Sequence, residues 1–229
     1  MGISAFLEKP LRAEALEPYD YLMEEIVNFE GASVDQEQME ALMNLVAYHE
    51  SDKTMDPSTI QKSNVKNEKG EVIGSKEGPG RGLYQYEITT GSKQGGGRTA
   101  MNRLLTAYGG ERNPQGAYSK LPNWAKEYFD VNNDSGYPNP KGDVDFSELT
   151  EEQQKILFLA DKLIEPNAIK DIGQISATEW WAKHHHKGTE SNVQGFSNDA
   201  MRYLKGEFRR AHNIDAPPEK GEPDYYIPQ

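Results

Sequence analysis

Apolar side chains recur every three or four residues along much of the chain, a pattern typical of helices with one buried face. The first such stretch runs from Leu16 to Ile26, and Pro18 near its start is tolerated in a first helical turn. The same reasoning predicts helices over residues 35–50, 100–108, 122–129, 150–164, 176–186 and 201–208. In the last of these, Met201, Leu204 and Phe208 form the expected apolar face.

Three of the predicted helices begin with a capping signature, in which an N-cap residue is followed three positions later by Gln or Glu. The pairs are Asp35 with Gln38, Thr150 with Gln153, and Ser176 with Glu179. Behind Asp35, the apolar residues from Met39 to Val46 lie on one helical face. We expect this face to contact the core and the helix to end near Glu50.

Between Ser63 and Ser75 the pattern changes from helical to extended. The tetrapeptide Asn67-Glu-Lys-Gly70 is a turn signal between two short apolar runs, which predicts a small hairpin. A third extended piece is predicted over residues 83–89, and residues 130–147, rich in Asn, Asp, Gly and Pro, are expected to form a long surface loop. The predicted fold class is therefore mainly α (α+β), with about seven helices and one small antiparallel sheet.

The composition excludes several classes of protein. The chain carries 37 acidic and 25 basic residues, a net charge of −12, whereas nucleic-acid binding needs a basic face. It has no Cys, so disulfides and thiol chemistry are excluded. The longest apolar run, Ile156–Ala160, is too short for a membrane span, and the N-terminus lacks the pattern of a secretory signal. We expect a soluble, acidic protein with no nucleic-acid partner and no membrane span.

Two short strings carry the candidate chemistry. The first is Glu50-Ser51, at the end of the apolar helix, and the second is Gly82-Leu-Tyr-Gln85-Tyr86, beyond the hairpin. A Glu at the end of a buried helix is partly removed from water, which raises the pKa of its carboxyl and keeps it protonated as a general acid. Cleavage of a glycosidic bond needs such an acid, and Gln85 can donate and accept hydrogen bonds across a cleft.

In this order and spacing, the two strings resemble the "Glu-Ser … Gly-Leu-Met-Gln" signature of the lysozyme-like superfamily, in particular soluble lytic transglycosylases and goose-type lysozymes. The resemblance covers residues 33–110, and Tyr84 replaces the usual Met. It implies a lysozyme-like helical domain that binds peptidoglycan glycan strands and cleaves the β-1,4 bond between N-acetylmuramic acid and N-acetylglucosamine. The family's Ala-Tyr-Asn motif has only a near match, Ala107-Tyr-Gly109, which lacks the Asn.

Carried over by position, the resemblance gives Glu50 the role of general acid and base. In a lytic transglycosylase, Glu50 would protonate the leaving O4 and then take the proton of the muramyl 6-hydroxyl, giving a 1,6-anhydro product without water. Ser51 would orient the carboxyl, Gln85 would line the sugar cleft, and Tyr84 and Tyr86 are further candidates for substrate contact, besides their ordinary role in packing.

Three other interpretations stay open. A lysozyme-type hydrolase, such as an endolysin, would need a second carboxylate, for which Asp52, Asp56, Glu77 and Glu87 are candidates. The chain is alternatively a structural or ejected virion protein that keeps the fold without the activity. A metal-dependent hydrolase would use His184-His-His186, but adjacent helical residues point about 100° apart and converge poorly on one ion. We therefore expect no metal and no cofactor. The simpler interpretation of the three histidines is that cationic side chains are favoured at a helix C-terminus.

The same features suggest a setting. No secretory signal, no Cys and a strongly acidic chain suit a bacteriophage protein that reaches the cell wall within the virion, or from the host cytoplasm at lysis. We expect an N-terminal arm over residues 1–12, a catalytic domain over residues 13–212 and an extended Pro-rich tail over residues 213–229. The N-terminal helix or this tail would contact other virion proteins.

Overall fold

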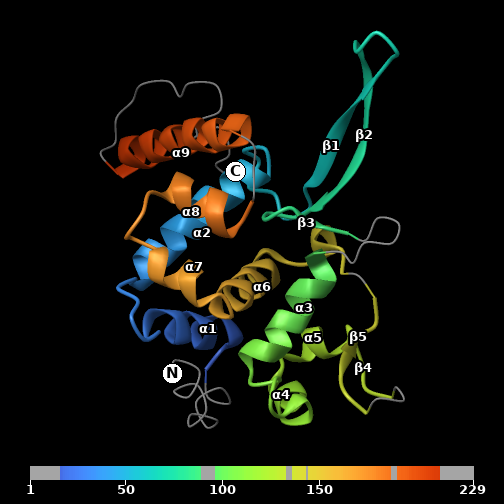
Figure 1. Ribbon diagram of the computed structural model, residues 1–229, viewed down its shortest axis with the longest axis vertical. Helices are drawn as coiled ribbons and strands as arrows, with labels where there is room; N and C mark the ends of the chain where they lie inside the picture. The colour runs from blue at the N-terminus through green and yellow to red at the C-terminus, as the bar shows by residue number, and fades with distance from the viewer. Residues whose placement is uncertain (1–15, 89–95, 133–135, 143, 187–189, 212–229) are drawn as a thin grey trace.

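The computed structural model describes residues 16–88, 96–132, 136–142, 144–186 and 190–211 (Figure 1). The predicted arm 1–12 and tail 213–229 lie outside these residues. The described helices are α1 (Pro18–Val27), α2 (Gln36–Glu50), α3 (Gly96–Ala107), α4 (Pro114–Lys120), α5 (Asn123–Lys126), α6 (Glu151–Leu163), α7 (Pro166–Asp171), α8 (Ala177–His184) and α9 (Glu190–Ala211), with a 3₁₀ turn, η2 (Phe146–Glu148). The mainly helical fold class is confirmed.

The helix starts follow the capping signatures. Asp35 and Thr150 form complete capping boxes, in which the side chain accepts from the backbone three residues on and the Gln there bonds back. Ser176 caps α8 by accepting from the backbone N–H of Glu179. The sequence pattern did not indicate α4 or α7, both short helices with Pro in the first turn.

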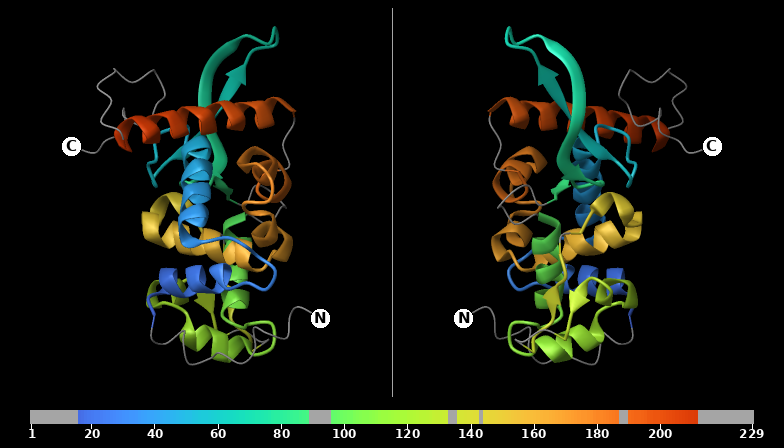
Figure 2. Two further views of the ribbon diagram at one scale, coloured as in Figure 1. Left: turned by 90° about the vertical axis from the view of Figure 1, so that its left-hand side faces the viewer. Right: turned by 90° about the vertical axis from the view of Figure 1, so that its right-hand side faces the viewer.

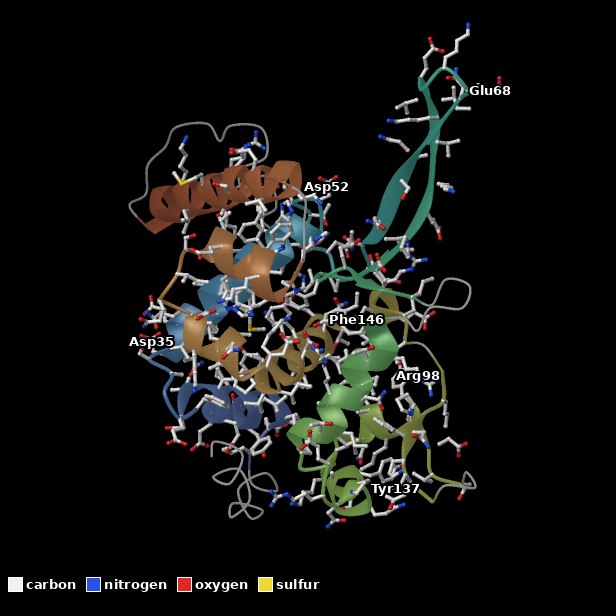
Figure 3. All side chains as sticks on the ribbon, viewed as in Figure 1. Asp35, Asp52, Glu68, Arg98, Tyr137 and Phe146 are labelled. Carbon is white, nitrogen blue, oxygen red and sulfur yellow. The ribbon has the colours of Figure 1, made fainter. Side chains whose placement is uncertain are left out.

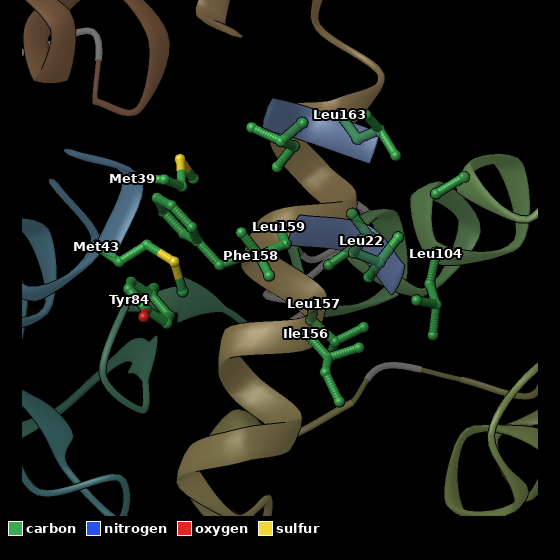
Figure 4. Packing of buried hydrophobic residues seen from close by; sticks show 14 of the residues in the cluster. Leu22, Met39, Met43, Tyr84, Leu104, Ile156, Leu157, Phe158, Leu159 and Leu163 are labelled. Atoms are coloured by element: carbon green, nitrogen blue, oxygen red, sulfur yellow. The ribbon is translucent and has the colours of Figure 1, made fainter. Parts of the chain in front are cut away.

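Helix α6 is the centre of the molecule, and its apolar run Ile156–Ala160 is buried on every side. Helices α1 and α3 pack along it, and Leu22 from α1 and Leu104 from α3 reach its side chains (Figure 4). Met43 of α2 approaches Phe158 from the other side. Five consecutive apolar residues cover every face of a helical turn, so this part of α6 must be enclosed to keep its side chains out of water.

The predicted hairpin is confirmed as strands β1 (Ile60–Lys66) and β2 (Val72–Arg81), which join the short β3 (Tyr86–Glu87) in the antiparallel order β1-β2-β3. The hairpin projects from the helical body in all three ribbon views (Figures 1 and 2). Glu68 marks its outer tip (Figure 3). Only the base of the hairpin lies beside the helices, so the sheet reaches the candidate site through β3 and the turn before it.

Two expectations were wrong in detail. Residues 130–147 are not simply a surface loop, because β4 (Phe129–Asp130) pairs with β5 (Asn139–Pro140), and Val144 and Phe146 are buried. The last helix begins near residue 190, and its core contacts come from Phe196 and Ala200, whereas Met201 and Leu204 are 57% and 51% exposed. Local apolar spacing found this helix but not the face that the neighbouring helices cover.

Candidate active site

Glu50 is the last residue of α2, and its side chain is only 11% exposed. Burial disfavours the charged carboxylate and raises the pKa of Glu50 above its ordinary value. A hydrogen bond from Trp181 and the nearby His49 and His186 act in the opposite direction without cancelling this effect. The negative end of the α2 dipole also disfavours an anion here. The carboxyl therefore has the environment of a proton donor.

The carboxyl is held from α8. The indole Nε1–H of Trp181 donates to Glu50 Oε1 at 2.8 Å, and Nε2 of His185 lies 3.6 Å from the same oxygen. Trp181 itself is fully buried. In the ribbon, α8 lies against α2, so a residue 131 positions further along the chain completes the surroundings of Glu50 (Figure 1).

Helix α9 closes the other side of Trp181. The Phe196 ring stacks on the indole with centroids 4.9 Å apart and planes 14° from parallel. His49 meets the indole edge-on at 5.1 Å, and His186 lies 5.0 Å away. Aromatic contacts on several sides leave the indole little freedom to rotate.

Asp199 of α9 ties this aromatic group to α2. Its carboxylate is 2.8 Å from Nδ1 of His49 and 3.1 Å from Nζ of Lys53. Arg202 approaches the same carboxylate at 3.4 Å. His49 therefore takes part in the docking of α9 beside the acid.

The string Gly-Leu-Tyr-Gln forms a tight turn and not the expected extended piece. Gly82 has φ +74° and Gln85 has φ +48°, both in the left-handed region. The buried carboxamide of Gln154 fixes the turn. Its Oε1 accepts from the backbone N–H of Leu83 at 2.7 Å, and its two Nε2 hydrogens are shared among the carbonyls of Pro57, Phe146 and Leu149. Sequence reasoning missed Gln154, because in the sequence it has no feature that distinguishes it from other polar residues in the first turn of a helix.

The structure contradicts a substrate contact for Tyr84. Its side chain is 2% exposed and stacks on Phe158 of α6, with centroids 4.3 Å apart (Figure 4). The ring fills the core beside Met43, so it cannot reach a sugar without unpacking the domain. Tyr86, which is only partly buried, stacks on Phe146 at 4.5 Å, and its hydroxyl is buried.

The other predicted site residues have different partners from those expected. Ser51 is fully buried, and its hydroxyl accepts from the backbone N–H of Met55 at 2.9 Å. The hydrogen bond to the Glu50 carboxyl comes from Trp181, so the orienting role predicted for Ser51 is not supported. Gln85 donates from Nε2 to the Gly82 carbonyl at 2.7 Å within its own turn.

His185 connects the two motifs. Its ring lies beside Glu50 and meets the Tyr86 ring edge-on, and it also hydrogen-bonds to the backbone of Tyr84. Burial lowers the pKa of His185 to about 3, so its ring is neutral at pH 7. Glu50 and the turn before β3 thus both contact one uncharged imidazole.

The three consecutive histidines point to three different partners. His184 pairs with Asp171 at 2.8 Å, His185 faces Glu50, and His186 packs on Trp181. Within the described part of the chain, no group of His, Asp and Glu side chains is arranged to hold a metal ion. Helix α8 ends at His184, and His185 is its C-cap, so the three side chains leave the backbone in different directions.

The four candidate second carboxylates have partners or surroundings that do not include the Glu50 carboxyl. The Asp52 side chain is 92% exposed, and Glu77 pairs with Arg81 on the hairpin. Asp56 accepts from the backbone and hydroxyl of Ser58, and Glu87 is exposed on β3. None of the four is among the groups that shift the pKa of Glu50.

The near match to the Ala-Tyr-Asn motif is not at the site either. Tyr108, just beyond the end of α3, is buried and packs against Tyr21 of α1, with ring centroids 5.1 Å apart. That end of α3 lies away from the end of α2 that carries Glu50 (Figures 1 and 2). Tyr108 therefore belongs to the core between α1 and α3.

Comparison with known proteins finds no matching family model, no matching curated protein and no matching solved structure. Among the described helices, none is both long and apolar enough to cross a membrane.

Proposed function

We propose that the protein cleaves the β-1,4 bond between N-acetylmuramic acid and N-acetylglucosamine in peptidoglycan, as a lytic transglycosylase with Glu50 as general acid and base. One observation carries the proposal: Glu50 is a buried carboxyl of raised pKa, held by one donor and adjoining the turn Gly82–Gln85 through His185. The two motifs that resemble the lysozyme-like superfamily are therefore neighbours in space as well as in order.

The reaction needs one carboxyl in two protonation states. The protonated Glu50 gives its proton to the glycosidic O4 as the bond from C1 to O4 breaks. The resulting Glu50 carboxylate then takes the proton of the muramyl 6-hydroxyl while O6, the oxygen of that hydroxyl, bonds to C1. The acid is regenerated, no water is consumed, and the product ends in a 1,6-anhydro sugar.

Among the described residues, no hydrogen bond or ion pair joins any of the four candidate second carboxylates to Glu50, Trp181 or His185, which favours this reaction over hydrolysis. A hydrolase of either stereochemistry would place a second carboxylate about 5 Å or about 6.5–9.5 Å from the acid. The four candidates from the sequence point to solvent, to the hairpin or to their own turn. A location in a phage particle stays a prediction, because nothing in the geometry of the site bears on it.

The test is mass spectrometry of muropeptides released from purified sacculi by the wild-type protein and by Glu50→Gln, with a chelator present throughout. We expect anhydromuropeptides from the wild type and a loss of about 100-fold or more in Glu50→Gln, because the amide has no proton to give. Glu68→Gln, at the hairpin tip, is the matched control and should keep the activity.

The other outcomes each point elsewhere. Reducing ends would indicate a hydrolase and a second carboxylate that sequence and structure have not identified. No release by a folded wild-type protein would favour the structural or ejected virion protein. Inhibition by the chelator would contradict the proposal in favour of a metal-dependent hydrolase.

A further inference from the structure

Among the residues that the structure describes, the hydrogen bond and the histidine contact on the Glu50 carboxyl are both made to one oxygen. Trp181 donates to Oε1 at 2.8 Å, and His185 Nε2 lies 3.6 Å from that atom. An indole N–H is a donor only, whereas a protonated carboxyl has one carbonyl-like oxygen and one hydroxyl oxygen. The carbonyl-like oxygen is the better acceptor, so the indole favours placing the acid proton on Oε2.

We propose that Trp181 is the positioning residue of Glu50, which holds Oε1 so that Oε2 carries the proton and delivers it to the glycosidic oxygen. This role rests on the proposed function, since it acts through Glu50 and touches no substrate. The contact between indole and carboxyl is independent of that function and can be measured by itself.

The surroundings make Trp181 a rigid donor. Its ring is stacked on Phe196 from α9 and meets the ring of His49 from α2 edge-on. The Asp199 carboxylate holds His49 in turn. A donor fixed before the reaction costs no reorganisation when charge develops on the carboxyl. Replacing this residue removes a preorganised contact and not only buried area.

The neighbouring tryptophan has the same burial and a different partner. Trp180 is fully buried and donates its indole N–H to the backbone carbonyl of Ala168 at 2.6 Å. Trp180→Phe and Trp181→Phe therefore each remove one buried hydrogen bond and a similar volume. Only Trp181→Phe removes the donor to Glu50, so the pair separates a positioning role from a structural one.

The activity arm measures the rate of muropeptide release against pH for the wild type and both variants. The rate falls as pH rises through the pKa of Glu50, because the acid must be protonated. Since the Trp181 hydrogen bond lowers that pKa, Trp181→Phe should move the falling limb to higher pH. It should also reduce the maximal rate by about 10-fold or more through the misplaced proton. Trp180→Phe should leave the limb in place.

The second arm needs no activity. Trp124→Phe/Trp180→Phe leaves Trp181 as the single tryptophan, because the chain has three. Its emission is recorded against pH, with and without Glu50→Gln, which keeps the shape of the side chain and removes its charge. We expect a transition that is lost in the Gln variant.

Other titrating groups contribute to this curve and are controlled by the comparison. His49 and His186 contact the indole, while His185 lies on Glu50, and these three stay in both proteins. Behind them lie the charges of Asp199 and Lys53 at His49, and of Asp161 and Lys162 at His185. Only the transition that depends on Glu50 reports the proposed contact.

An unmoved limb in Trp181→Phe, or the same shift in Trp180→Phe, would overturn the positioning role. Identical emission curves with and without Glu50→Gln would contradict the contact between the Trp181 indole and the Glu50 carboxyl, even if the wild type released anhydromuropeptides. Conversely, a Glu50-dependent transition in a protein that releases nothing would overturn the catalytic role together with the proposed function, and would leave the indole–carboxyl contact established.

Discussion

At the scale of single residues, Glu50 stands out because it pairs burial with an ionisable group. Its environment favours the neutral acid, so the features that would make Glu50 a proton donor also make its ionised form unfavourable for the fold. Trp181 offsets part of this cost with one hydrogen bond. Stability and function are therefore expected to oppose each other at this position.

We expect Glu50→Gln to be more stable than the wild type at pH 7. The folded-state pKa is raised, so the carboxyl contributes its stability below the unfolded value near 4.5 and loses it as pH rises through the folded value. Gln does not ionise, so the two proteins should converge near pH 4. Thermal unfolding measures the difference, at about 2–4 °C for each kcal/mol in a chain of this size.

The control for this measurement is the exposed Glu68, because Glu68→Gln should give the same melting temperature as the wild type at both pH values. A Glu50→Gln protein that melts with or below the wild type at pH 7 would show that burial of the carboxyl is not costly. The indole contact would then be a net stabilising interaction.

At the scale of elements, the glycines next to the two ends of β2 have similar backbone conformations but differ in how tightly they are packed. Gly70 in the hairpin turn has φ +80° and open space around its Cα. Gly82 in the turn after β2 has φ +74°, but a Cβ there would overlap the Gln154 carboxamide and come within 3.0 Å of Phe146 Cβ. The positive φ favours glycine at both positions, whereas close neighbouring atoms exclude a larger side chain only at Gly82.

We therefore expect Gly70→Ala to cost about 1 kcal/mol, from the left-handed backbone alone. Gly82→Ala should cost about 3 kcal/mol or more, because the carboxamide that holds the turn must also move. Urea unfolding of both variants measures these costs. Equal losses would show that Gln154 yields without cost and does not fix the turn.

At the scale of the whole molecule, helix α9 completes the candidate site from the far end of the chain. Burial alone would raise the pKa of Asp199, but hydrogen bonds from His49 and Lys53 outweigh it and hold this pKa below its ordinary value. The carboxylate therefore links α9 to the end of α2 beside Glu50. In Figure 1, α9 lies across α2 and α8, the two helices that carry the acid and its donor.

Asp199→Asn should cost about 1.5–3 kcal/mol at pH 7, the range for hydrogen bonds to charged groups. Because the folded pKa is lowered, the stability is present above the unfolded value near 3.8 and is lost as pH falls through the folded value. The difference from the wild type should therefore shrink in acid, as urea unfolding at pH 7 and pH 3 would show.

Asp52→Asn is the matched control, because Asp52 also contacts Lys53 but its side chain is 92% exposed. It should unfold with the wild type at both pH values, since exposed ion pairs contribute little. A constant loss in Asp199→Asn from pH 7 to pH 3 would indicate that its role is packing and not charge.

The sequence by itself determined the local features of this protein. The capping boxes at Asp35 and Thr150, the hairpin turn and the end of α2 at Glu50 depend on residues within about four positions of one another. Such contacts form whichever way the rest of the chain folds. The position of the candidate acid at a helix end was predictable for this reason.

Only the tertiary structure decided what surrounds that acid. Trp181 meets Glu50 across 131 positions, and Gln154 meets Leu83 across 71, and neither partner carries a local signal. The burial of Tyr84, the exposure of Met201 and the neutral state of His185 likewise follow from which helices pack together. Residue spacing records a face of an element, whereas the three-dimensional packing determines what covers that face and so sets its chemistry.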